Sequence, residues 1–163
     1  MFREATIDDV CALRDLEREA NLAGLGHVFP AERYPFPDAD VLARWALVLD
    51  EPGVTVLVRD DAERGGGRID VFAAYDDHSL RHLAVHPDRW GSGLASTAID
   101  AVLRAMEQRG TAVAELWCLE DNRRARRLYE YLGWRLTDDR RAAPWPPHPT
   151  EMRYTRLIAQ SDR

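Results

Sequence analysis

The stretch from Leu80 to Trp134 limits the fold of this chain more than any other segment. It combines apolar runs with glycines placed where helical patterns begin and end, so its elements have defined limits. We expect a strand, a helix, a second strand and a second helix at Leu80–His86, Gly93–Gln108, Ala112–Leu119 and Asp121–Leu132. Strands and helices that alternate in this order predict an α/β or α+β domain.

The remaining elements flank this segment. Thr6-Ile7-Asp8-Asp9 has the form of a capping box that opens a first helix, and a second helix is expected at Asp38–Leu49. A glycine-rich connection at Arg64–Arg68 separates two expected strands. The further strands are expected at Phe2–Ala5, Val54–Arg59, Ile69–Tyr75, Trp134–Thr137 and Glu151–Ile158. This order of elements predicts a mixed sheet.

Length and composition fit one soluble domain, which we place at residues 1–163. Of the 163 residues, 45% are hydrophobic and 31% are charged. The net charge of -6 argues against nucleic acid as the main partner, because phosphate binding requires a concentrated basic surface. No apolar run is long enough to span a membrane and no signal peptide is evident, so we expect a cytoplasmic location and no membrane partner.

Cysteine and histidine patterns predict no metal site. Cys11 and Cys118 both lie within apolar patterns, and we expect both to be buried thiols. His78, His82 and His86 recur every four residues, but on a strand this spacing spreads them too far apart to bind one ion. We therefore expect these histidines at the surface or at the edge of the core.

A glycine turn joins the strand at Leu80–His86 to the following helix. Gly91 and Gly93 carry no side chain, so a phosphate can approach backbone N–H groups at the helix N-terminus. A purely structural turn has the same appearance. Two competing phosphate motifs are disfavoured, because a Walker loop requires Lys, which the chain lacks, and a dinucleotide-binding turn requires a third glycine where Ser96 stands.

The helix at Asp121–Leu132 places four residues along one stripe. Asn122, Ala125, Arg126 and Tyr129 occur at positions i, i+3, i+4 and i+7, so an amide, a guanidinium and a phenol share one face. From this segment alone, a solvated basic helix with Tyr129 as a core aromatic residue is an equally good interpretation.

Together, the glycine turn and this helix resemble the GCN5-related N-acetyltransferase superfamily. The turn matches the family motif Gln/Arg-x-x-Gly-x-Gly/Ala at Gly93 and Ala95. The later segment matches the family order of Asn, Ala, Tyr and then Gly with an aromatic residue. Trp90 departs from the motif, because it stands where the family has Gln or Arg. The resemblance implies a mixed, mostly antiparallel sheet of about six to seven strands flanked by about four helices.

The resemblance also implies acetyl-CoA as the cofactor, with the acetyl group passing directly to an amine. The implied cofactor-binding residues are Leu83, Ala84, Val85, Arg89, Trp90, Gly91, Ser92, Gly93, Leu94, Ala95, Asn122 and Arg126. Tyr129 matches the family's general acid, which protonates the departing thiolate. No base is identified, and proton removal through ordered water is favoured. The candidate bases are Asp76, Asp77, His78, His82 and Glu115.

The resemblance further implies that two proline-rich loops, Asn21–Asp38 and Ala143–Pro149, select the acceptor. They contribute His27, Phe29, Tyr34 and Phe36 from the first loop, and Trp145 and His148 from the second. These rings either hold an amine through cation–π contacts or anchor the loops. We expect a small-molecule amine or a peptide N-terminus as the acceptor. A homodimer, a non-catalytic acyl-CoA-binding module and a nucleotide-dependent oxidoreductase stay open as alternatives.

Overall fold

The computed structural model describes residues 1–61 and 67–158, and within them seven strands form one mixed sheet. The strands are β1 (Arg3–Glu4), β2 (Thr55–Asp60), β3 (Ile69–Tyr75), β4 (Ser79–Val85), β5 (Val113–Leu119), β6 (Arg135–Ala142) and β7 (Thr150–Leu157). Their spatial order is β1-β2-β3-β4-β5-β7-β6. Strands β4 and β5 are parallel, and the other neighbours are antiparallel. The expected mixed, mostly antiparallel sheet is confirmed.

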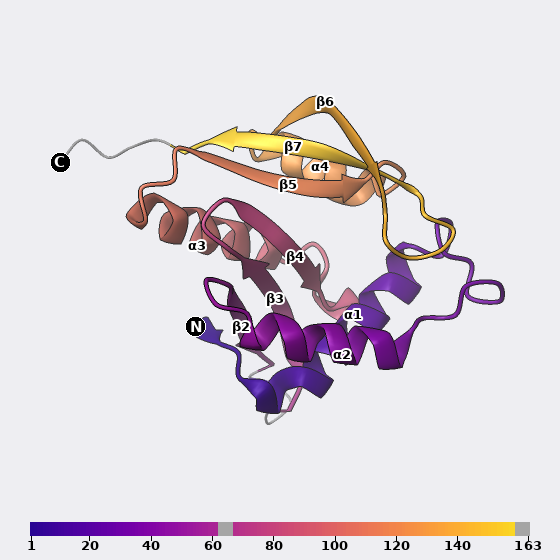
Figure 1. Ribbon diagram of the computed structural model, residues 1–163. Helices are drawn as coiled ribbons and strands as arrows, with labels where there is room; N and C mark the ends of the chain where they lie inside the picture. The colour runs from indigo at the N-terminus through magenta and orange to yellow at the C-terminus, as the bar shows by residue number, and fades with distance from the viewer. Residues whose placement is uncertain (62–66, 159–163) are drawn as a thin grey trace.

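Helices cover both faces of the sheet (Figure 1). Within the described residues the α-helices are α1 (Val10–Gly24), α2 (Asp38–Asp50), α3 (Leu94–Gln108) and α4 (Arg123–Tyr131). On one face, Leu13 of α1 and Trp45 of α2 belong to the same buried cluster as Phe72 of β3. Strand β3 is buried along its whole length, because helices lie on either side of it.

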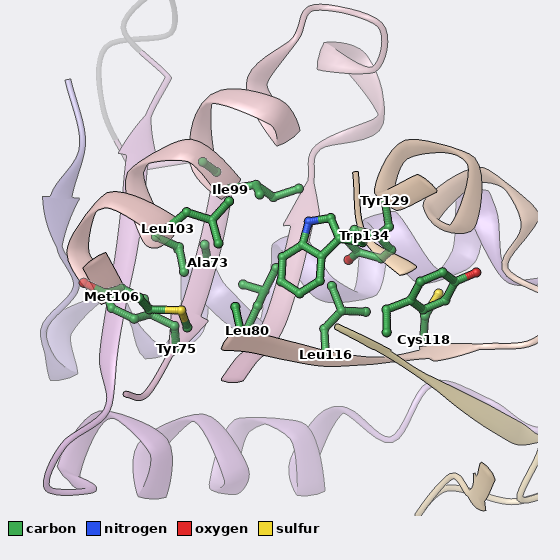
Figure 2. Packing of buried hydrophobic residues seen from close by; sticks show 14 of the residues in the cluster. Ala73, Tyr75, Leu80, Ile99, Leu103, Met106, Leu116, Cys118, Tyr129 and Trp134 are labelled. Atoms are coloured by element: carbon green, nitrogen blue, oxygen red, sulfur yellow. The ribbon is translucent and has the colours of Figure 1, made fainter. Parts of the chain in front are cut away.

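The second buried cluster lies under α3 and α4. Its members include Ile99, Leu103 and Met106 of α3, which lie over Ala73 and Tyr75 of β3 (Figure 2). Tyr129 of α4 and Trp134, which follows that helix, extend the same cluster to Leu116 and Cys118 of β5. This cluster therefore joins the two halves of the sheet.

Strands β4 and β5 separate soon after they meet. Ser79 pairs with Glu115 and Leu80 with Leu116, and no later pair follows in the described residues. In Figure 1, β5, β6 and β7 form an upper half that diverges from β3 and β4. The second half of β4 therefore keeps one edge without a strand partner.

Most predicted boundaries lie within two residues of the observed ones. The first helix runs to Gly24, so the following loop begins at Leu25 rather than at Asn21. Strand β6 is longer than expected, because its second half also pairs with β7 beyond an irregularity.

Cys118 is buried as predicted. The prediction for Cys11 was wrong, because Cys11 lies on the exposed side of α1, away from Leu13.

Two further expectations concern the glycine-rich connection and the lack of a membrane-spanning segment. Most of the glycine-rich connection at Arg64–Arg68 falls outside the described residues. In the part of the chain that the structure describes, no helix is long and apolar enough to cross a membrane.

Candidate active site

A cavity of about 410 Å³ lies where β4 separates from β5, and we call it the splay cavity. Its walls come from the end of α1, the second half of β4, the glycine turn with the start of α3, and α4. The lining residues are Ala20, Asn21, Gly24, Leu25, Leu83, Ala84, Val85, Arg89, Trp90, Gly91, Gly93, Leu94, Ala95, Ser96, Asn122, Arg124, Ala125, Leu128 and Tyr129. The splay cavity thus brings together Tyr129 and all but two of the predicted cofactor-binding residues.

The free edge of β4 offers backbone groups to this cavity. The His86 N–H donates to the Asp70 carbonyl at 2.8 Å, which fixes the alternation of the β3–β4 ladder. Ala84 therefore directs its N–H and C=O toward β3, and Leu83 and Val85 direct theirs away from it. The Val85 carbonyl is already bonded, because the Trp90 indole Nε1 donates to it at 2.8 Å.

The glycine turn needs left-handed backbone at two positions. Gly91 has φ of 78° and Gly93, the N-cap of α3, has φ of 83°, conformations that side chains with a Cβ rarely adopt. The first N–H groups of α3 have no intrahelical partners and point toward the turn. Partial positive charge gathers there, so the turn favours a negatively charged ligand group.

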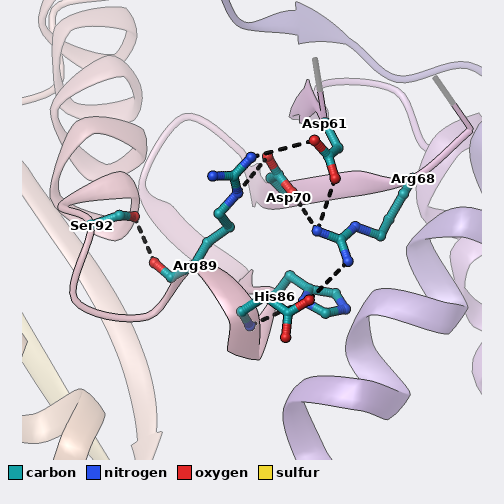
Figure 3. Close-up of polar contacts among 7 residues, drawn as sticks. Asp61, Arg68, Asp70, His86, Arg89 and Ser92 are labelled. Carbon is teal, nitrogen blue, oxygen red and sulfur yellow. Dashed lines mark hydrogen bonds and ion pairs between the residues drawn. The ribbon is translucent and has the colours of Figure 1, made fainter. Parts of the chain in front are cut away.

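A buried ion-pair network holds this turn from behind (Figure 3). Asp61 and Asp70 are only 2% and 3% exposed, and burying such charges is costly unless they are paired. Arg89 reaches Asp61 at 3.3 Å and Asp70 at 3.3 Å, and Arg68 lies 2.9 Å from Asp61. The guanidinium of Arg89 is thus committed to the protein interior.

Asn122 and Tyr129 approach the cavity from α4. The Asn122 side chain is the N-cap of this helix, and its Oδ1 accepts the Ala125 N–H at 3.2 Å. Tyr129 is 8% exposed, and its hydroxyl makes no hydrogen bond within the described residues. Burial and the neighbouring Cys118 raise the pKa of the Tyr129 phenol well above its usual range. The phenol therefore stays protonated at neutral pH and can donate to a group in the cavity.

Cys118 is not available as a nucleophile. Burial raises the pKa of its thiol to about 12, and the thiolate is the reactive form. The side chain also belongs to the buried cluster beneath α3 and α4 rather than to the lining of the splay cavity.

A second cavity, of about 550 Å³, lies between the two proline-rich loops, and we call it the loop cavity. Its aromatic lining residues are Phe29, Tyr34, Phe36 and Trp145. Glu17 and Asp40 contribute carboxylates, and Arg33 contributes a cation. Asn21 lines both cavities, so the two meet at the C-terminal half of α1.

Three predicted site residues line neither cavity. Ser92 donates its hydroxyl to the Arg89 carbonyl at 2.6 Å within the turn. Arg126 donates to the Tyr154 hydroxyl at 3.1 Å and to the Glu120 carbonyl at 3.0 Å, so it braces α4 against β7. The His27 Nε2 lies 2.8 Å from the Asp121 carbonyl, which fixes the first loop to the start of α4.

The candidate bases also lie outside both cavities. Asp76 caps the β3–β4 turn through the N–H groups of His78 and Ser79, and Asp77 pairs with Arg109. Glu115 accepts from the Ser79 hydroxyl and pairs with Arg153. His82 packs near Trp45, and burial together with Arg44 and Arg81 lowers its pKa to about 3. No group of three metal-ligand side chains occurs among residues 1–61 and 67–158.

Sequence reasoning missed two parts of the splay cavity. The end of α1 contributes Ala20, Asn21 and Gly24, far from the motifs in sequence. Arg124 also lines the cavity, although the helical stripe pointed to Arg126 instead. A helix that begins at Arg123 leaves its first turn facing the glycine turn, which the spacing alone did not reveal.

Solved structures of similar fold are numerous. A GCN5-related N-acetyltransferase from Rhodopseudomonas palustris superposes with a TM-score of 0.81 at 18% identity, over 97% of this chain and 95% of that one. The ribosomal-protein-S18-alanine N-acetyltransferase from Escherichia coli superposes with a TM-score of 0.72 at 20% identity, over 100% of this chain and 96% of that one. The PaiA N-acetyltransferase from Thermoplasma acidophilum, in complex with coenzyme A, gives 0.69 at 14% identity, over 94% and 96%.

These identities are low, so they show a shared fold. No curated protein is similar enough in sequence to be matched. The sequence itself matches the acetyltransferase (GNAT) family over residues 12–134, a span that contains the splay cavity and most of the loop cavity. The chain therefore belongs to the acetyltransferase (GNAT) family, and it is an acyltransferase.

Proposed function

We propose that this enzyme transfers the acetyl group of acetyl-CoA to the amine of a small molecule, with Tyr129 as the general acid. The observation that carries the proposal is that Tyr129 lines the splay cavity while its hydroxyl has no hydrogen-bond partner among the described residues. A protonated phenol without a partner can form a hydrogen bond to a departing sulfur, and the negative charge that develops on that sulfur draws the proton from it. Coenzyme A in the similar-fold PaiA structure supports the choice of cofactor.

The groups that line the splay cavity suit the successive parts of an acyl-CoA. The unpaired edge of β4 can hold the pantetheine arm through the N–H and C=O of Leu83, as an added strand would. Ala84 contributes only its side chain, because its backbone faces β3. Gly91 and Gly93 let the pyrophosphate approach the N-terminus of α3 closely. Asn122 closes the opposite wall.

The chemistry requires few groups from the protein. Acetyl-CoA supplies a thioester whose carbonyl carbon is open to attack by an amine. The Val85 N–H faces the free edge of β4, where it can stabilise negative charge on the carbonyl oxygen. Tyr129 then donates its proton to the departing sulfur. Because the candidate bases line neither cavity, the amine loses its proton to water before or during attack.

The loop cavity supports a small-molecule acceptor. Its aromatic rings and the carboxylate of Asp40 suit an organic cation, whereas the Glu17 carboxylate is already bonded to Arg44 and the Trp45 indole. Its volume of about 550 Å³ lies in the range of small-molecule sites. Asn21 lines both cavities, so an amine held in the loop cavity would lie next to the splay cavity, where we place the thioester. A peptide N-terminus remains the second acceptor class for testing, in line with the activity of the Escherichia coli protein of similar fold.

The test is calorimetric titration with acetyl-CoA, with NAD as control, followed by a screen for free-thiol release over small amines and peptides. We expect binding of acetyl-CoA alone and turnover with a small amine. Turnover with peptides only would replace the acceptor class. Binding without turnover on the whole panel would favour a non-catalytic acyl-CoA-binding module, and binding of NAD instead would refute the proposal.

A further inference from the structure

Trp90 lines the splay cavity, and its ring is held there by contacts with two elements. Its indole Nε1 is bonded to the Val85 carbonyl, which fixes the ring against the end of β4. A Cβ added at Gly24 would lie 3.3 Å from the Trp90 Cη2, so the ring also touches the end of α1. The ring is thus held on two sides, and its remaining face is turned toward α4.

That face carries a guanidinium. The Arg124 Cζ lies 3.7 Å from the centroid of the Trp90 ring, a distance typical of a stacked cation–π pair. Arg124 has no ion pair with a carboxylate anywhere in residues 1–61 and 67–158. It lines the splay cavity together with Gly91 and Gly93. Partial burial lowers the pKa of Arg124, and a guanidinium stays protonated in proteins.

The other cation at the turn is already engaged. Arg89 also lines the splay cavity, but its guanidinium pairs with the buried carboxylates of Asp61 and Asp70 (Figure 3). Moving it toward a ligand would leave two buried charges short of a partner, which is costly. Trp90 itself carries no charge. Of the two arginines that line the splay cavity, Arg124 is therefore the one without a carboxylate partner among residues 1–61 and 67–158, and it lies beside the place of a dianionic group on the glycine turn.

We propose that Arg124, held on the Trp90 indole, binds the pyrophosphate of coenzyme A. This inference rests on the proposed function and adds to it the side chain that completes the phosphate site. Stacking on the Trp90 ring orients the planar guanidinium of Arg124. Less side-chain entropy is therefore lost when two of its N–H groups bond to phosphate oxygens. Trp90 acts through Arg124 as a positioning residue, and the charge reaches the turn from α4.

The test compares the affinity of coenzyme A for the wild-type protein and for Arg124→Ala by calorimetry. We expect about a tenfold loss for Arg124→Ala, because a charge-assisted contact to a phosphate is removed. The matched control is Arg123→Ala, an adjacent exposed arginine that lines neither cavity, and its affinity should be unchanged. Equal affinity of Arg124→Ala and wild type would overturn the inference while leaving the proposed function intact. Failure of the wild type itself to bind would instead refute the proposed function.

Two further arms locate the phosphate and the role of the ring. With 3′-dephospho-coenzyme A the tenfold difference should persist, and its disappearance would assign Arg124 to the 3′-phosphate and overturn the pyrophosphate assignment. Trp90→Ala should weaken binding about fivefold, but adding it to Arg124→Ala should cost little more. Trp90→Phe, which keeps a ring, should bind more tightly than Trp90→Ala. Additive losses would show that Trp90 does not act through Arg124.

Discussion

The splay cavity and the loop cavity meet at Asn21, but they are built from different kinds of structure. The splay cavity is framed by the end of α1, β4, the start of α3 and α4, and the free edge of β4 and the glycine turn present backbone groups to it. The loop cavity is framed by two proline-rich segments that place side chains around a hollow. One cavity is defined by the path of the main chain, and the other by the identity of the rings.

This difference shows how one fold can keep a cofactor while it changes an acceptor. Backbone groups present the same donors and acceptors whatever side chains surround them, provided that the strand edge and the glycine turn persist. Loop side chains can be exchanged without disturbing a sheet. Substitutions should therefore divide by cavity: changes at the splay cavity should affect cofactor binding or chemistry, and changes at the loop cavity should affect only the acceptor.

The largest effect is expected at Tyr129. Tyr129→Phe keeps the buried ring and removes only the hydroxyl, so we expect kcat to fall by about 100-fold with little change in acetyl-CoA affinity. Tyr131→Phe is the matched control, because Tyr131 lies on the same helix and is 85% exposed. Steady-state kinetics and calorimetry on both variants check this prediction. An unchanged kcat in Tyr129→Phe would remove the phenol from the mechanism.

The next largest effect is expected at Gly93, where the backbone conformation shapes the splay cavity. Gly93→Ala forces a side chain into left-handed backbone at φ of 83° and adds a methyl group where a phosphate must approach. We expect a loss of about 1–2 kcal/mol in unfolding free energy and at least a tenfold loss in acetyl-CoA affinity.

Gly110→Ala is the control variant that separates the effect of backbone strain on stability from the effect on the binding site. Gly110 has φ of 82° at the end of α3, and an added Cβ there meets nothing within 4 Å, as at Gly93. Both variants should lose similar stability in denaturant unfolding, and only Gly93→Ala should lose affinity. A similar loss of affinity in both would mean that the glycine turn matters through stability alone.

The two cavities were also unequally predictable from the sequence. The turn at Gly91 and Gly93 and the position of Tyr129 could be predicted, because glycine spacing and helical periodicity are local properties. The contribution of Asn21 could not, since it depends on how α1 packs beside β4, about sixty residues later in the chain.

Helical periodicity also failed to predict which of two arginines on α4 faces the splay cavity. The stripe through Asn122 and Tyr129 included Arg126, but that side chain turns to Tyr154 of β7. Arg124 faces the cavity instead, because Trp90 provides a surface for it. A period of 3.6 residues places Cα atoms on a face, and long side chains then follow the partners that tertiary structure supplies.

A smaller effect is expected at the loop cavity. Trp145→Ala removes a large ring from its wall, so we expect the KM of the amine found in the screen to rise about tenfold. The affinity for acetyl-CoA, measured on the same sample, should change less than twofold. Because Trp145 also packs against the cluster under α1 and α2, thermal unfolding must show that the variant is folded at the assay temperature. A parallel loss of cofactor affinity would contradict the separation of the two cavities.

The smallest effect on turnover is expected at His82, which lies on β4 but lines neither cavity. Its pKa is lowered to about 3 from an ordinary value of 6.5, chiefly by burial, so the folded protein keeps it neutral while the unfolded chain protonates below about pH 6.5. Stability should therefore fall between pH 7 and pH 5, by at most about 2 kcal/mol from this group, and His82→Gln should reduce that slope. Turnover at pH 7–8 should stay within about twofold of wild type, because in the mechanism that we propose water takes the amine proton. A large loss of kcat together with the loss of an ionisation from the pH profile would instead make His82 the base, and would give β4 a catalytic side chain on the acceptor side.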